Sequence, residues 1–138
     1  MPKIIATAEA VNTGAAYSTD ITIHQHHLLA DELPEAGGTD AGPAPGDYLC
    51  SALASCKTIT LRMYAQRKQW KVDAIKVKVD LVKGDQLPSG NNTFFCEITL
   101  TGELDDTQRA RMLEIAKACP IHRLLGKPSE IVTIMDGL

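Results

Sequence analysis

The chain carries four cysteines, the residue type whose side chain can attack an electrophile, bind a metal ion or form a disulfide. They are Cys50, Cys56, Cys96 and Cys119. The first two lie six positions apart in the stretch PGDYLCSALASCKT, whose apolar spacing is helical. Six residues rise about 9 Å along a helix and turn the side chains about 120° apart, whereas a disulfide needs Cα atoms within about 7 Å. Cys50 and Cys56 therefore cannot bond to each other within an intact helix.

Cys56 and Cys119 are the two cysteines that the apolar pattern directs toward the interior. A long helix is predicted over residues 45–68, and a second helix over residues 105–119, where a proline ends it. The expected inner stripe of the long helix consists of Leu49, Leu53, Cys56, Thr60 and Met63. Two such helices packed together could bring the thiols into reach. A free cysteine also packs as a small hydrophobe, so the pattern leaves open both a working pair and a purely structural one.

A working thiol must be ionised, because only the thiolate attacks and a free thiol titrates near about 8.5. The helix dipole acts within the first turn, and Cys56 lies about three turns after Pro45. A cation or a hydrogen-bond donor from elsewhere is therefore required. Lys57 and Arg62 are near in sequence, but helical spacing places them off the Cys56 stripe. Asp47 lies in the first turn, where a carboxylate favours the positive end of the helix.

A metal site is the other chemistry that these residue types allow. His24 and His26 are predicted to share one face of a strand, and Cys119 and His122, in the sequence CPIH, could both bind zinc. No Cys-x-x-Cys spacing accompanies them. We therefore interpret His122 as a residue that supports the thiol site or lies in solvent.

The elements that must position these residues begin with strands, predicted up to about Leu29. The stretch ADELPEAGGTDAGPAPGD follows, and its glycines, prolines and acids predict a loop. Such a long loop indicates a functional segment or an exposed boundary. It leads directly into the long helix.

After the long helix, the strict alternation in VDAIKVKVDLV and the matching run TFFCEITLTG predict two strands paired as a hairpin. Cys96 falls on the apolar side of the second strand, and we interpret both Cys96 and Cys50 as packing residues. The tail SEIVTIMDGL is predicted to form a final short strand. This order of elements indicates an α+β fold with an antiparallel sheet, a long central helix and a second helix, rather than an alternating βαβ fold.

Length and composition limit the classes of function. At 138 residues the chain fits a single domain, residues 1–138, and its 44% hydrophobic and 22% charged content is typical of a globular protein. A net charge of −3 and 4% aromatic residues argue against nucleic acids or acidic membranes as partners. No run approaches the roughly 20 apolar residues of a membrane helix, and the first ten residues lack the pattern of a secretory signal. We therefore expect a cytoplasmic protein with reduced cysteines.

Three parts of the chain together resemble the OsmC family, which includes the osmotically induced protein and the organic hydroperoxide resistance proteins. They are the loop and long helix ADELPEAGGTDAGPAPGDYLCSALASCKTITLRMYA, the stretch GELDDTQRARMLEIAKACPIH and the final predicted strand. The resemblance covers about residues 20–135. It implies an α+β fold in which two chains intertwine as a homodimer, with a long helix from each at the centre.

The resemblance also implies a chemistry that uses no cofactor. Active members reduce peroxides, preferring organic ones, and by position Cys56 resembles their peroxidatic cysteine and Cys119 their resolving one. The resulting Cys56 sulfenic acid would condense with Cys119 to a disulfide, which a dithiol reductant then opens. The alternative is a non-enzymatic, stress-associated binding protein whose cysteines are only part of the core.

Two family positions are occupied differently in this chain. Active members supply an arginine from the N-terminal strands to stabilise the thiolate, and a glutamate just after the helix-start proline to orient that arginine. Here the first arginine is Arg62, and Gly46 occupies the glutamate position with Asp47 beside it. The resemblance therefore does not name the group that activates Cys56, and Asp47 and His122 are the candidate supporting residues.

Overall fold

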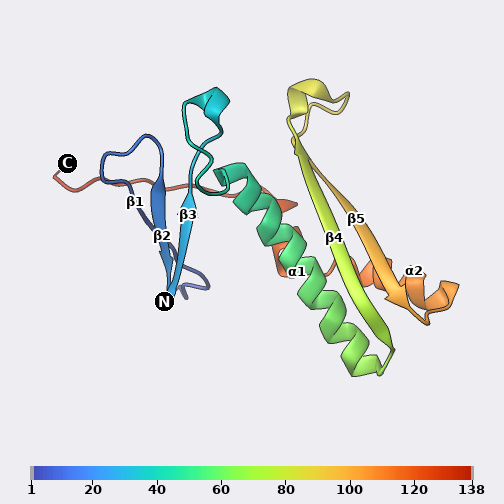
Figure 1. The fold of residues 1–138 in the computed structure, drawn as a ribbon. Coiled ribbons are helices and arrows are strands. Elements are labelled where there is room, and N and C mark those ends of the chain that lie inside the picture. Colours follow the sequence, from blue (N-terminus) through green and yellow to red (C-terminus); the bar gives the residue numbers. More distant parts are fainter. Residues whose placement is uncertain (1, 138) are drawn as a thin grey trace. The chain divides into compact units, whose positions relative to one another are not determined.

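The computed structural model describes residues 2–137 (Figure 1). Its strands and α-helices are β1 (Glu9–Val11), β2 (Thr19–Ile23), β3 (His26–Ala30), α1 (Pro45–Lys68), β4 (Val72–Val82), β5 (Thr93–Gly102), α2 (Asp106–Ala116) and α3 (Pro120–Leu125). The predicted α+β class with antiparallel sheets is confirmed. The chain divides into two compact units, with the boundary between Leu49 and Cys50 inside α1. Within residues 2–137, no helix has the length and apolar character needed to cross a membrane.

The first unit contains a three-stranded antiparallel sheet in the order β1-β2-β3. Its second hairpin corrects one expectation, because His24 and His26 do not share a strand face. The chain reverses after Ile23, which pairs with His26, and His24 lies in the turn with a φ of 53°. Histidine tolerates this left-handed backbone better than most residues, and without glycine or proline the turn has no sequence signal.

The predicted loop between β3 and α1 is ordered around the buried carboxylate of Asp31, which is 2% exposed. The carboxylate accepts hydrogen bonds from the backbone N–H groups of Glu32 at 2.8 Å and Ala41 at 3.1 Å, and from the Thr39 hydroxyl at 2.8 Å. These bonds, led by those from Ala41 and Glu32, hold the pKa of Asp31 far below its usual value. A short 3₁₀ helix, η1 (Pro34–Ala36), lies within the same loop.

The second unit is built on the β4–β5 hairpin, which confirms the sequence prediction. The register pairs Val77 with Ile98 and Ile75 with Leu100, so the predicted apolar residues of the two strands share one face. A second 3₁₀ helix, η2 (Gly84–Gln86), begins the connection. The core joins α1, β4 and α2 through Leu61, Tyr64, Ala65, Val72, Met112 and Ala116. Figure 1 shows α1 running alongside β4.

The face of α1 that is buried differs from the predicted stripe. The buried positions are Leu53, Lys57, Leu61, Tyr64 and Ala65, whereas Met63 is 65% exposed and Cys56 is only partly buried. The inner face is therefore rotated by about one residue, or about 100°. Because α1 is apolar around most of its circumference, several stripes fit the sequence, and packing against the hairpin and α2 selects among them.

The segment after β5 confirms one prediction and corrects two. Asp105 and Gln108 form the predicted capping box at the start of α2. The helix ends at Ala116, and Cys119 instead caps a further helix, α3, that was not predicted. The final strand is also wrong for this chain, because the described tail, residues 129–137, forms no strand. A strand needs a neighbour for its backbone N–H and C=O groups, and no other described segment pairs with this one.

Candidate active site

The structure brings Cys56 and Cys119 together within the second unit. Cys56 lies in the middle of α1 and is partly exposed, whereas Cys119 is fully buried at the N-cap of α3. The Cys119 side chain interacts with that of Cys56 and accepts a hydrogen bond from the backbone N–H of His122 at 3.4 Å. Both cysteines are free thiols. Two thiols in contact can pass between a dithiol and a disulfide.

The two cysteines have different surroundings. Burial raises the pKa of the Cys119 thiol, and its interaction with the Cys56 side chain raises that pKa further, while the His122 N–H acts in the opposite direction. Cys119 is therefore protonated at neutral pH. A molecule from solvent can reach Cys56 but not Cys119, because Cys119 has no exposed surface. The two thiols therefore differ in access to solvent: Cys56 is partly exposed and Cys119 is buried.

A buried lysine lies beside this pair. Lys57 is 3% exposed, and its Nζ donates to the carbonyl oxygen of Ala116 at 2.8 Å and lies 2.8 Å from Nδ1 of His122. No carboxylate within residues 2–137 forms an ion pair with it. Lys57 lies off the predicted Cys56 stripe, as expected, but it is buried because the inner face of α1 is rotated toward it. The only sequence signal was its place four residues after Leu53 and four before Leu61.

His122, a predicted supporting residue, contacts both Lys57 and Cys119. Burial lowers the pKa of its imidazole, and the charges of Lys57 and Lys117 lower it further. The ring is therefore neutral at neutral pH. An ammonium group can only donate, so Nδ1 accepts from Lys57 and the ring proton lies on Nε2.

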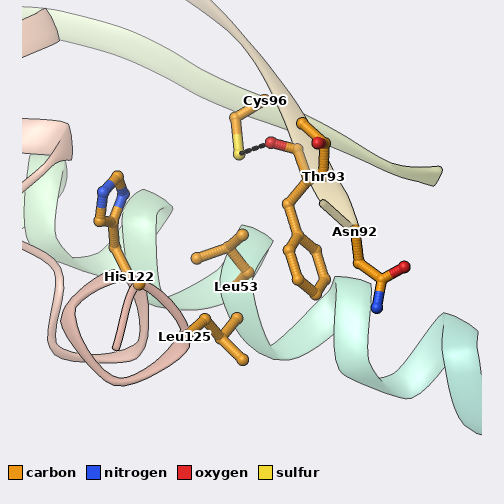
Figure 2. Close-up of a pocket in the computed structure, with 8 residues that line it drawn as sticks. Leu53, Asn92, Thr93, Cys96, His122 and Leu125 are labelled. Atoms are coloured by element: carbon orange, nitrogen blue, oxygen red, sulfur yellow. Dashed lines mark hydrogen bonds between the residues drawn. The ribbon is translucent and has the colours of Figure 1, made fainter. Parts of the chain in front are cut away.

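A cavity of about 230 Å³ adjoins His122 (Figure 2). Its apolar walls include Leu53 from α1, Phe94 from β5 and Leu125 from α3. Its polar surface includes the imidazole of His122 and the sulfur of Cys96, which lies 3.9 Å from the Phe94 carbonyl oxygen. The cavity can therefore accept a small organic molecule with a polar end near His122.

Cys96, predicted to be a packing residue, is exposed and lines this cavity rather than the core. Burial is the main cause that raises the pKa of its thiol, followed in size by the opposing charge of Lys57. Cys50 is partly buried on α1.

The remaining candidate residues have structural contacts elsewhere. Asp47 accepts a hydrogen bond from the backbone N–H of Ala44 at 3.0 Å, which places its carboxylate at the start of α1 as expected. Arg62 donates to the carbonyl oxygen of Val72 at 2.7 Å. Among the residues that the structure describes, no group of three or more His, Cys, Asp or Glu side chains could hold a metal ion.

The fold and the site together define a class of protein: an α+β chain with a cysteine on a long helix and a second, buried cysteine packed against it. The model of the OsmC-like protein family matches residues 38–134. This chain belongs to that family. No protein of curated function matches the sequence at a significant level.

Solved structures of the family share this fold. An OsmC-like protein from Mycoplasma pneumoniae is 20% identical with a TM-score of 0.73, over 91% of this chain and 89% of its own. An organic hydroperoxide resistance protein from Legionella pneumophila is 17% identical with a TM-score of 0.62, over 91% of each chain. The organic hydroperoxide resistance protein OhrB of Bacillus subtilis is 22% identical with a TM-score of 0.57, over 88% of this chain and 90% of its own. At these identities the likeness establishes the fold.

Proposed function

We propose that this protein is a thiol peroxidase that reduces organic hydroperoxides through Cys56 and Cys119. The observation that carries the proposal is the contact between a partly exposed thiol and a buried, protonated one. The neighbouring cavity supports an organic substrate, because its apolar walls suit the carbon skeleton of a hydroperoxide. Two of the structural relatives are named organic hydroperoxide resistance proteins, which favours the same substrate class.

The proposed reaction has three steps. The Cys56 thiolate attacks the terminal peroxide oxygen, so that an S–O bond forms, the O–O bond breaks and the alkoxide takes a proton to leave as an alcohol. The Cys119 sulfur then attacks the sulfur of the Cys56 sulfenic acid. An S–S bond forms, the S–O bond breaks, and the departing hydroxide takes the Cys119 proton to leave as water. A dithiol reductant opens the disulfide by exchange and is itself oxidised. We place this cycle in the cytoplasm, where thiols are kept reduced.

We also propose that the protein acts as a homodimer. Ile59 and Met63 on α1 are 53% and 65% exposed, and they line an apolar groove of about 390 Å³ that also includes Ile75 of β4. In the tail, Ile131 and Ile134 are 90% and 91% exposed. Apolar surface of this kind marks an interaction site, and a second copy would supply the strand neighbour that the tail lacks.

The test of the peroxidase is consumption of an organic hydroperoxide in the presence of dihydrolipoamide or dithiothreitol. Wild-type protein is expected to consume peroxide catalytically, whereas the Cys56→Ser variant has only the background rate of the reductant. Cys50→Ser is the matched control, since it removes a thiol from the same helix and should retain the wild-type rate. Equal rates for wild type and Cys56→Ser contradict the proposal.

A non-enzymatic binding protein is the second candidate, and the full burial of Cys119 is the observation that favours it. In that case both thiols belong to the core, and Cys56 resists alkylation until the protein unfolds. The peroxidase instead requires that native Cys56 reacts with iodoacetamide while Cys119 does not. Alkylation of the native protein followed by peptide mass spectrometry separates the two.

A further inference from the structure

We propose that Lys57 is the positioning residue of the thiol pair: it fastens the turn that carries Cys119 to α1 and fixes the orientation of His122. Cys119 is thereby held where it can attack an oxidised Cys56. This inference rests on the proposed peroxidase function and concerns its second step, the formation of the disulfide.

Lys57 forms hydrogen bonds to residues on both sides of Cys119 in the sequence. Its ammonium bonds the carbonyl of Ala116, three residues before Cys119, and the ring of His122, three residues after it. Lys57 itself directly follows Cys56 on α1. The Lys57 side chain therefore links the residues before and after Cys119 to α1, one residue from Cys56. Because sulfur–sulfur attack needs close contact and alignment, this link decides how readily the disulfide forms.

The charge of Lys57 indicates a role beyond packing. Both acceptors of its hydrogen bonds are neutral, and no carboxylate of residues 2–137 pairs with it. Burying an ammonium group without a counter-ion carries a desolvation penalty. An apolar residue of similar length would avoid that penalty. The hydroxide that leaves during disulfide formation is an anion that this charge would stabilise.

Lys57 could also serve only as a cap at the end of α2, without a role in disulfide formation. The carbonyl of Ala116 lies at the end of α2, where a lysine can act as a helix cap. A cap alone lowers stability when it is removed, but it leaves the chemistry of the thiols and of His122 unchanged. Lys117 offers a matched control, because it is exposed and its charge also acts on His122, yet neither bond described above depends on it.

The first experiment is a single turnover of the reduced protein with one equivalent of cumene hydroperoxide. Loss of peroxide reports the first step, and mass spectrometry of the quenched protein reports the Cys56–Cys119 disulfide. In Lys57→Met the disulfide is expected to form about tenfold or more slowly. Sulfenic and sulfinic acid should accumulate on Cys56 of that variant instead. Lys117→Met is expected to form the disulfide at the wild-type rate.

The second measurement does not depend on peroxidase activity. Nitrogen NMR of the His122 ring in wild type should show a proton on Nε2 and an acceptor at Nδ1 at neutral pH. In Lys57→Met the fixed tautomer should be lost, and the pKa of His122 should rise toward its ordinary value because the nearest charge is gone. The groups that still face the ring are Lys117, Cys119 and Cys96.

The outcomes separate the two proposals. If wild type forms no Cys56–Cys119 disulfide, the proposed function fails and the role of Lys57 in that step fails with it. A wild-type rate of disulfide formation in a folded Lys57→Met variant overturns the role of Lys57 alone. If that variant does not fold, the wild-type spectrum decides, because a proton on Nδ1 of His122 overturns the assigned contact.

Discussion

At the scale of single residues, the site consists of two cysteines that differ in their surroundings. Cys56 is partly exposed on a long helix, and Cys119 is buried with a raised pKa. Lys57, on the same helix as Cys56, is buried and its ammonium lies 2.8 Å from the ring of His122, in a chain whose N-terminal strands contain no arginine.

Removing Cys119 should separate the two steps of the reaction. In Cys119→Ser, Cys56 still reduces one equivalent of peroxide, but the sulfenic acid has no partner and is oxidised further to sulfinic acid. Catalytic turnover with a dithiol should fall well below that of wild type. Mass spectrometry of the Cys56 peptide after stepwise addition of peroxide checks this. Undiminished turnover, with no sulfinic acid on Cys56, would show that Cys119 has no resolving role.

The depressed pKa of His122 predicts a dependence of stability on pH. The ring of the unfolded chain titrates near 6.5, whereas the folded protein binds this proton only at lower pH. Between these two values the unfolded state binds more protons, so stability falls as pH is lowered through this window. His122→Asn should weaken the decline, as measured by denaturant midpoints across the window. His24→Asn, in the exposed turn, should retain it, since asparagine accepts the same backbone conformation.

At the scale of the elements, the sequence predicted those whose signals are local. The β4–β5 hairpin follows from strict alternation, and the start of α2 from its capping pair. The buried face of α1 could not be predicted, because an apolar circumference offers several equivalent stripes. Because of that ambiguity the burial of Lys57 was not predicted, whereas Cys56, Cys119 and His122 were named as candidate residues from the sequence. The short helix α3 was missed because Pro120, taken as the end of one helix, occupies the first position of the next.

The loop before α1 yields a prediction for the first unit. The Asp31 carboxylate receives hydrogen bonds that stabilise its charged form, so this contribution to stability is present above its unfolded pKa and is lost as pH falls below it. Asp31→Asn should lower the unfolding midpoint at neutral pH and expose the loop to proteolysis. Glu35→Gln removes an exposed carboxylate from the same loop and should do neither. Equal protease resistance in both variants would contradict a structural role for Asp31.

At the scale of the whole molecule, the exposed apolar residues of α1 and the tail are the observation on which the proposed homodimer rests. The exposed apolar residues of the tail have no neighbouring strand among the described residues, and a second copy is the partner that the proposal supplies.

The dimer is tested by placing a charge in the apolar groove on α1. Met63→Glu should shift the protein from dimer toward monomer in sedimentation equilibrium, because the carboxylate would lose its hydration at the interface. Thr99→Glu adds the same charge at an exposed position on β5 and should leave the mass unchanged. A monomeric wild-type protein at micromolar concentration would refute the homodimer.

The central claim is that Cys56 and Cys119 form a redox pair driven by a hydroperoxide. The most direct measurement is peptide mass spectrometry of the reduced wild-type protein after one equivalent of cumene hydroperoxide, with free thiols blocked by alkylation. A redox pair should yield a disulfide that joins the Cys56 and Cys119 peptides, with the thiols of Cys50 and Cys96 alkylated. Peroxide treatment that leaves Cys56 and Cys119 as two alkylatable thiols would contradict it.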